Sequence, residues 1–193
     1  MALKAVFLDR DGTINYDPGY LNNPDDVFLI EGVGEALRIL KNSGYLLLVV
    51  SNQSGIARGL ITEEEVLAVN NRINDLLRKY HGVSIDHFFY CPHHEDFSDP
   101  EDCNCRKPAT GMFDQAQQKY DIDISRSWMI GDSVADIVAA ANLGIPSILV
   151  ATGNGREHIS VLQEQNKIPS FTCSNLLDSA KLIIKLKSGV SVC

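Results

Sequence analysis

The chain has 193 residues, of which 45% are hydrophobic and 22% are charged, and its formal net charge is −8. This length suffices for one domain with a sizeable core, and the acidic surface argues against nucleic acid or an anionic membrane as a partner. The first apolar run is cut short by Asp9, and the longest, 45–50, is far too short to cross a bilayer. We therefore expect a cytoplasmic protein with no membrane segment.

Short apolar runs alternate with helical periodicity along the whole chain. The spacing predicts strands at 3–9, 45–51, 86–90, 128–131 and 146–150, and helices at 32–43, 62–80, 111–120, 134–142 and 175–186. Thr62 and Glu65 have the spacing of a capping box at the start of the longest helix. This alternation predicts a Rossmann-like α/β fold, a parallel sheet with helices on both faces, in a single domain covering 1–193.

Polar side chains stand where three of these strands end. The first strand runs into Asp9, the second into Ser51, and the fourth into Asp132. Asp11 and Asp136 add two more carboxylates, and the carboxyl ends of parallel strands share one crevice. Carboxylate oxygens with few other neighbours suit Mg²⁺, although Asp11-Gly12 is also a common turn pair.

Four ordered motifs resemble those of the haloacid dehalogenase superfamily of phosphatases. They are the D-x-D-G-T box at 9–13, Ser51 at the end of an apolar strand, Lys107 before Pro108, and the acidic pair Asp132 and Asp136. The resemblance covers residues 3 to 152, and four motifs in order are far more specific than any single one. A lysine taken alone is more often a solvated surface charge.

The resemblance implies a role for each of these side chains. Asp9 would attack phosphorus to form an aspartyl-phosphate, and Asp11 would protonate the leaving alcohol and then activate water. Ser51 and Lys107 would hold the transferring phosphoryl oxygens. The implied magnesium ligands are Asp9, Asp11 and Asp132, while Asp136 is expected to hold Lys107 or a metal-bound water.

A polar loop at 91–105 contains three of the five cysteines. Three thiols and one imidazole match a structural zinc site, with Cys91, His93, Cys103 and Cys105 as the expected ligands. His94 could replace His93, although a place in solvent or behind the ligands is expected for it. The alternatives are unpaired surface cysteines or a disulfide such as Cys91–Cys103. Cys173 is expected to be a small buried residue, and Cys193 to lie in a frayed terminus.

The sequence of this loop indicates which family within the superfamily the chain resembles. The run C-P-H-H together with C-x-C-R-K-P resembles the D-glycero-D-manno-heptose 1,7-bisphosphate 7-phosphatases and the related histidinol-phosphatases. The substrate contacts that the resemblance implies are Asp17, Pro18, Gly19, Tyr20, Ser51, Asn52, Gln53, Ser54, Arg106 and Lys107. Two positions depart from the pattern: Ser51 stands where Thr is frequent, and Ser133 stands where a Lys can help to bind substrate.

The resemblance therefore implies a magnesium-dependent phosphatase that removes the 7-phosphate of a heptose bisphosphate for the synthesis of bacterial surface glycans such as lipopolysaccharide. Alternatives are a histidinol-phosphate phosphatase and a zinc-braced binding module without catalysis; a polynucleotide 3′-phosphatase is disfavoured by the acidic surface. The segment between Asp11 and Ser51 is too short for a cap domain, so we expect an open crevice and a monomer. Arg58 could pair with a distal phosphate or brace a loop.

Overall fold

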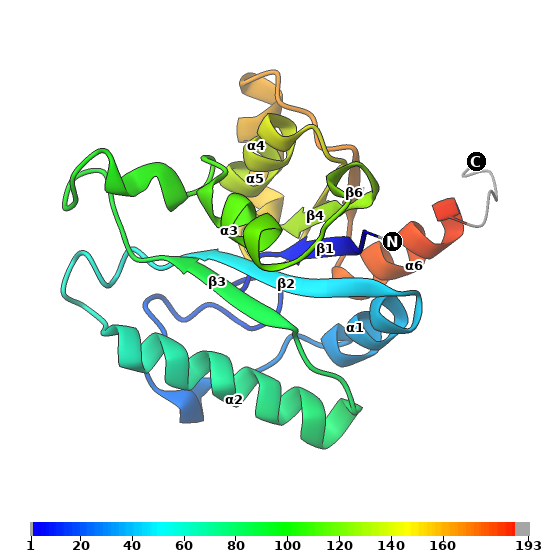
Figure 1. Cartoon of the computed structure of the whole chain (residues 1–193), viewed down its shortest axis with the longest axis horizontal. Coiled ribbons are helices and arrows are strands. Elements are labelled where there is room, and N and C mark those ends of the chain that lie inside the picture. The colour runs from blue at the N-terminus through cyan, green and yellow to red at the C-terminus, as the bar shows by residue number, and fades with distance from the viewer. Residues whose placement is uncertain (1, 188–193) are drawn as a thin grey trace.

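The sheet has six parallel strands, with β1 and β4 at its centre, and helices pack on both of its faces (Figure 1). Residues 2–187 are described in this computed structural model. The strand order is β3-β2-β1-β4-β5-β6. The strands are β1 (Lys4–Leu8), β2 (Tyr45–Asn52), β3 (His87–Cys91), β4 (Trp128–Gly131), β5 (Ser147–Val150) and β6 (Phe171–Cys173). The α-helices are α1 (Val33–Asn42), α2 (Glu63–His81), α3 (Gly111–Lys119), α4 (Val134–Leu143), α5 (Gly155–Glu164) and α6 (Leu176–Lys187).

The central strands are buried on both sides, which is why they are almost continuously apolar. Along β1, Val6 and Leu8 face a core formed with α1, α2 and α6, whereas Ala5 and Phe7 face a core formed with α3 and α4. Successive side chains of a strand point to opposite faces, so one short run supplies two cores. The predicted parallel α/β architecture is confirmed.

The ends of the predicted helices follow from their capping residues. The Thr62 hydroxyl accepts a hydrogen bond from the Glu65 backbone N–H, and the Glu65 carboxylate accepts one from the Thr62 backbone N–H, as the sequence predicted. A second capping box, which the sequence analysis missed, joins Ser133 and Asp136 at the start of α4. It orients Asp136 toward the carboxyl end of the sheet.

Two elements, α5 and β6, were not predicted. Leu162 is the only large apolar side chain that α5 buries, and β6 has three residues, so neither gives a clear periodic signal. Cys173 lies in β6. The sequence predicted a buried residue there, but Cys173 is only half-buried. Cys193 lies outside the described residues.

Two connections bear on the site. Between β1 and β2 the chain forms loops, a short 3-10 helix (Pro24–Asp26) and α1, which leaves the carboxyl end of β1 without a second domain above it in residues 2–187. The loop after β3 carries a second 3-10 helix (Asp102–Cys105) and leads to Lys107. None of the helices in this described part of the chain is long and apolar enough to span a membrane.

Candidate active site at the carboxyl ends of the strands

A crevice of about 280 Å³ opens beyond the carboxyl ends of β1, β2 and β4. It is lined by Asp9, Asp11, Asp17, Gly19, Tyr20, Leu21, Ser51, Asn52, Gln53, Ser54, Gly55, Lys107, Asp132, Ser133 and Asn154. The parallel register brings these strand ends to one edge of the sheet, so residues more than 100 positions apart converge. Of the expected substrate contacts, Pro18 and Arg106 do not line this crevice.

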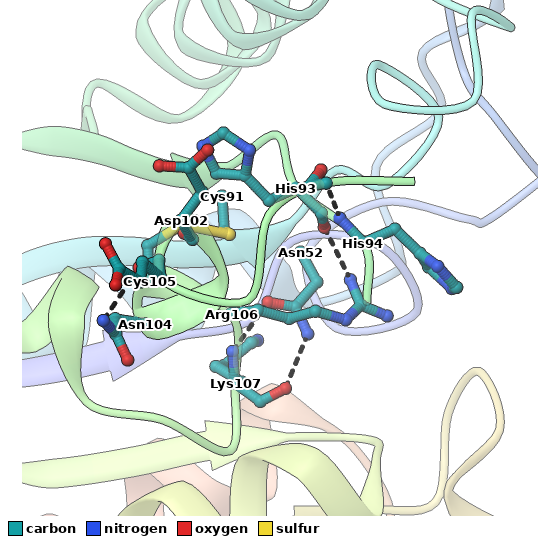
Figure 2. The surroundings of a disulfide bond; sticks show 11 residues. Asn52, Cys91, His93, His94, Asp102, Asn104, Cys105, Arg106 and Lys107 are labelled. Carbon is teal, nitrogen blue, oxygen red and sulfur yellow. Dashed lines mark hydrogen bonds between the residues drawn. A yellow bond between two sulfur atoms is a disulfide. The ribbon is translucent and has the colours of Figure 1, made fainter. Parts of the chain in front are cut away.

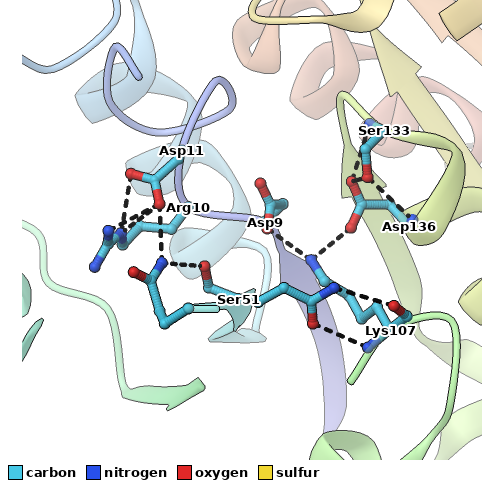
Figure 3. A network of polar contacts seen from close by, with 9 residues as sticks. Asp9, Arg10, Asp11, Ser51, Lys107, Ser133 and Asp136 are labelled. Atoms are coloured by element: carbon cyan, nitrogen blue, oxygen red, sulfur yellow. Dashed lines mark hydrogen bonds and ion pairs between the residues drawn. The ribbon is translucent and has the colours of Figure 1, made fainter. Parts of the chain in front are cut away.

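Lys107 is the central cation of the site. Its Nζ donates to Asp9 Oδ1 at 2.6 Å and to Asp136 Oδ1 at 2.5 Å (Figure 3). The residue is 3% exposed. Burial lowers the pKa of Lys107, but Asp136 and Asp9 outweigh burial, and the net pKa is raised. Asn52 holds the Lys107 backbone by accepting from its N–H at 2.9 Å and donating to its carbonyl at 3.0 Å. Lys107 is therefore charged and fixed, and Asp136 holds it as expected.

The carboxylates around Lys107 carry more negative charge than one ammonium balances. One oxygen each of Asp9, Asp132 and Asp136 lies within 4.8 Å of the others, and all three residues are buried. Burial, with Asp136 and Asp132 adding to it, raises the pKa of Asp9 well above its usual range. Burial also raises the pKa of Asp132 to about 6. A divalent cation would relieve this repulsion. Asp136 already accepts hydrogen bonds from Ser133, whereas Asp9 and Asp132 do not. Asp9 and Asp132 therefore fit Mg²⁺ as ligands.

Asp11 lies apart from that cluster. Its carboxylate pairs with Arg10 at 2.8 Å (Figure 3). It also accepts from Asn15 at 2.8 Å and from Gln53 at 2.9 Å. Burial raises the pKa of Asp11, but the Arg10 charge and these hydrogen bonds outweigh burial and lower it. The sequence grouped Asp11 with Asp9 and Asp132 as a magnesium ligand. In this structure its carboxylate contacts the buried Arg10 guanidinium, which offers it several donors at once, and its part in binding magnesium stays a prediction.

Arg10 was not singled out from the sequence, yet it is 1% exposed. Besides Asp11, its NH1 donates to Asn70 Oδ1 of α2 at 3.1 Å. Arg10, which stands between Asp9 and Asp11, thus links Asp11 to helix α2. A cationic residue between two acidic ones was the sequence signal that could have predicted this role for Arg10.

Gln53 links Ser51 to Asp11. Its amide Nε2 donates to Ser51 Oγ at 2.8 Å as well as to Asp11, and both Ser51 and Gln53 are buried. The Ser51 hydroxyl keeps its own proton for another acceptor in the crevice. This arrangement suits an anionic oxygen beside Ser51 and Lys107.

One wall of the crevice is the loop at Asp17 to Tyr20. Gly19 N–H donates to Asp17 Oδ1 at 2.8 Å, a turn closed by an Asp side chain. A Cβ on Gly55 would lie 2.7 Å from Tyr20 Cδ1 and 2.9 Å from Ile61 Cγ1. Glycine at 55 therefore lets the Tyr20 ring close this wall.

A second wall, after β5, was missed by the sequence analysis. Asn154 N–H donates to Asp132 Oδ2 at 2.8 Å, and His158 Nδ1 of α5 lies 3.0 Å from the Asp132 carbonyl oxygen. Gly12 has φ +81°, and a Cβ there would lie 2.3 Å from Asp132 Oδ2 and 3.1 Å from the Gly153 backbone. The T-G-N-G run after a predicted strand was the available signal for this close approach.

The cysteine loop differs from the predicted zinc site. Cys91 and Cys105 are joined by a disulfide, with their Cα atoms 5.4 Å apart (Figure 2). Cys103 is free and half-buried, and His93 is among the residues around the disulfide (Figure 2). Zinc needs thiolates, and a disulfide has none. In this covalent state the predicted set of Cys91, His93, Cys103 and Cys105 is therefore not a zinc site.

Three neighbouring side chains can be compared with what was expected of them. Arg106 was expected to point at the crevice, but its NH1 donates to the His93 carbonyl at 3.4 Å. His94 was expected in solvent or behind the ligands; it is 7% exposed, which excludes the place in solvent, and its Nε2 lies 2.7 Å from Arg58 NH2. Arg58 also lies over the Phe97 ring, 5.2 Å from its centre. Of its two expected roles, Arg58 therefore has the loop-bracing one in this structure.

Comparisons with known proteins agree with this geometry. A model of the HAD-hydrolase-like family matches residues 104–179. The D-glycero-β-D-manno-heptose-1,7-bisphosphate 7-phosphatase of Vibrio cholerae is 46% identical over 191 residues, covering 97% of this chain and 100% of the relative. The enzyme of the same name from Haemophilus ducreyi is 41% identical over 181 residues, covering 92% and 97%.

A solved structure extends the likeness to three dimensions. The D,D-heptose 1,7-bisphosphate phosphatase of B. bronchiseptica, crystallised with magnesium and phosphate, matches with a TM-score of 0.84 and 33% identity, covering 95% of this chain and 99% of that one. Such identity over almost the full length of both chains places them in one family. The chain belongs to the D-glycero-β-D-manno-heptose-1,7-bisphosphate 7-phosphatase family of haloacid dehalogenase-like hydrolases.

Proposed function

We propose that this protein is a magnesium-dependent phosphatase that removes the 7-phosphate of D-glycero-β-D-manno-heptose 1,7-bisphosphate. The observation that carries the proposal is the convergence of Asp9, Lys107 and Asp132 in one crevice. The named relatives supply the substrate, because they cover nearly all of this chain at more than 40% identity. The product would serve the synthesis of heptose-containing surface glycans.

In the first step, an Asp9 oxygen attacks phosphorus and the bond from phosphorus to the sugar oxygen breaks. Asp11 gives its proton to that leaving oxygen. In the second step, a water attacks the aspartyl-phosphate while Asp11 takes its proton, which frees Asp9 and inorganic phosphate. The observed contacts to Arg10 favour the charged form of Asp11, the form that the second step uses.

Ser51 and Lys107 bind the phosphoryl oxygens through a hydroxyl and an ammonium that the structure already holds in place. Mg²⁺, held by Asp9 and Asp132, would neutralise phosphoryl charge so that one anion can approach another. Asp136 fixes Lys107, and Asn154 fixes Asp132. The Asp17 to Tyr20 loop is the proposed contact for the sugar, and Arg106 would have to turn from His93 to reach a distal phosphate.

The substrate assignment is tested by comparing heptose 1,7-bisphosphate with histidinol phosphate in the presence of Mg²⁺. We expect kcat/KM for the heptose bisphosphate to be about 100-fold higher or more, because selectivity from polar contacts to the substrate can reach that size. Phosphorus NMR should identify heptose 1-phosphate as the product. Faster hydrolysis of histidinol phosphate would contradict the proposal and identify the protein as a histidinol-phosphate phosphatase.

We also propose that the 91–105 loop binds zinc when the Cys91–Cys105 disulfide is reduced. Reduction would give two thiolates whose backbones are already close, with Cys103 and His93 in the same loop. Zinc would then hold a segment with few apolar side chains and fix Arg106 and Lys107, which follow it directly.

Protein purified under reducing conditions without chelator should contain about one zinc ion per chain. Cys103→Ser should lower the zinc content severalfold, whereas Cys173→Ser, at the distant strand β6, should leave it unchanged. Metal analysis by mass spectrometry measures both. Zinc-free protein with intact Cys91 and Cys105 thiols would refute the zinc proposal.

The remaining parts of the proposal concern the form of the protein. We propose one phosphatase domain that works as a monomer in the cytoplasm on small molecules, without nucleic acid or membrane partners. Both faces of the sheet are covered by the chain's own helices, and the overall charge is acidic.

A further inference from the structure

The amino ends of the central strands form a second pocket, of about 270 Å³, at the opposite end of the sheet from the crevice. Lys4, Tyr45 and Trp128 line it from the starts of β1, β2 and β4, and the rest of the lining is Arg126, Ile183, Leu186 and Lys187. Lys4 precedes Asp9 by five residues along an extended strand, which corresponds to about 16 Å. The two sites are therefore separate.

Lys4 occupies a position that would suit an apolar residue. It points to the same face as Val6 and Leu8, which belong to the core, and it is 9% exposed. Its Nζ lies 3.8 Å from the centre of the Tyr45 ring. Within residues 2–187, no carboxylate forms an ion pair with it. A buried ammonium without a counter-ion is costly, so this position favours an anion from outside.

Two further cations stand at the rim of the pocket. Lys187 Nζ donates to the Ser43 carbonyl at 3.4 Å, and among residues 2–187 no carboxylate pairs with it. Arg126 has one ion pair, at 3.9 Å to Asp123, and at the surface such a pair compensates little. Burial, followed by the charges of Lys187 and Arg126, lowers the pKa of Lys4 to about 8. Three cations around one pocket stand out in a chain with a net charge of −8.

We propose that this pocket binds the phosphate group of a small molecule, either inorganic phosphate or a phosphomonoester. A phosphate dianion matches one buried and two rim cations better than a singly charged carboxylate does. The Tyr45 and Trp128 rings give the pocket apolar walls that can accept a carbon skeleton attached to the phosphate. This inference does not depend on the proposed function, because none of its residues lines the catalytic crevice.

Trp128 is the single tryptophan of the chain, so its fluorescence reports on this pocket alone. The protein is titrated with inorganic phosphate in EDTA at constant ionic strength set with NaCl. We expect a saturable change of Trp128 emission, weakened about tenfold or more in Lys4→Met and unchanged in Lys181→Met, an exposed lysine of α6. A parallel titration with glycerol phosphate distinguishes the two sources, since the tighter ligand identifies which one the pocket prefers.

Several results would overturn the inference. Emission that does not respond to either ligand would do so, as would an equal response to NaCl alone. An unchanged response in Lys4→Met would overturn it too, because the phosphate would then not be bound by Lys4. If circular dichroism shows that Lys4→Met does not fold, the double variant Arg126→Gln/Lys187→Gln replaces it, with the same expected loss, because both side chains are exposed.

Discussion

Asp9→Asn is expected to lower kcat on the heptose bisphosphate by more than about 1000-fold, a cost of roughly 4 kcal/mol in transition-state stabilisation. The amide has nearly the shape of the carboxylate but cannot form the phosphoryl ester. Lys107 keeps its contact with Asp136, so the site should remain assembled. Because burial disfavours the charge of Asp9, the neutral variant should unfold at a urea concentration equal to or above that of the wild type. Initial rates and urea denaturation measure the two effects.

Asp178→Asn is the matched control. It makes the same chemical change at an exposed position in the first turn of α6, far from the crevice, and should keep full activity. Residual activity of Asp9→Asn above about one part in 100 would contradict the assignment of the nucleophile. A trapped fluoride mimic of the phosphoryl group whose central atom lies away from the Asp9 oxygen would contradict it as well.

Five of the six strands and the crevice could be predicted because their signals are local. Apolar runs such as 45–50 define buried strands, and the carboxyl ends of parallel strands must meet at one edge. Asp9, Ser51 and Asp132 stand directly at these ends, so their convergence follows from the order of strands and helices. The Lys107 contact with Asp136 was expected from the resemblance, since no spacing relates a loop lysine to a helix 29 residues later.

The parts that were missed depend on contacts between distant segments. Arg10 holds the Asp11 carboxylate with one side of its guanidinium and donates to Asn70 of α2 with the other. The wall at Asn154 belongs to a turn before α5, a helix whose polar sequence gives little periodic signal. The pairing of Cys91 with Cys105 reflects the approach of β3 to the loop before Lys107, and cysteine spacing alone left zinc and disulfide open.

Lys107→Met should destabilise the fold by about 3–5 kcal/mol at pH 7.5 and abolish activity. Removing the ammonium leaves two buried carboxylates, Asp9 and Asp136, without their shared partner. The expected loss depends on pH. The folded-state pKa of Asp9 is already raised, so the folded variant binds more protons than the unfolded chain, and its stability falls as pH rises through that range. Urea denaturation should therefore show a smaller loss at pH 5.5 than at pH 7.5.

A second substitution separates lost charge balance from lost packing. Asp136→Asn in the Lys107→Met background removes one buried negative charge and keeps an oxygen that can accept from Ser133. We expect the double variant to be more stable than Lys107→Met by about 1–2 kcal/mol, although Asp136→Asn alone destabilises the wild type. Lys181→Met, at an exposed lysine, should change stability by less than about 0.5 kcal/mol. Additive losses in the double variant would mean that Lys107 stabilises the fold by filling space and that its ion pairs contribute nothing, and the electrostatic account of the site would then fail.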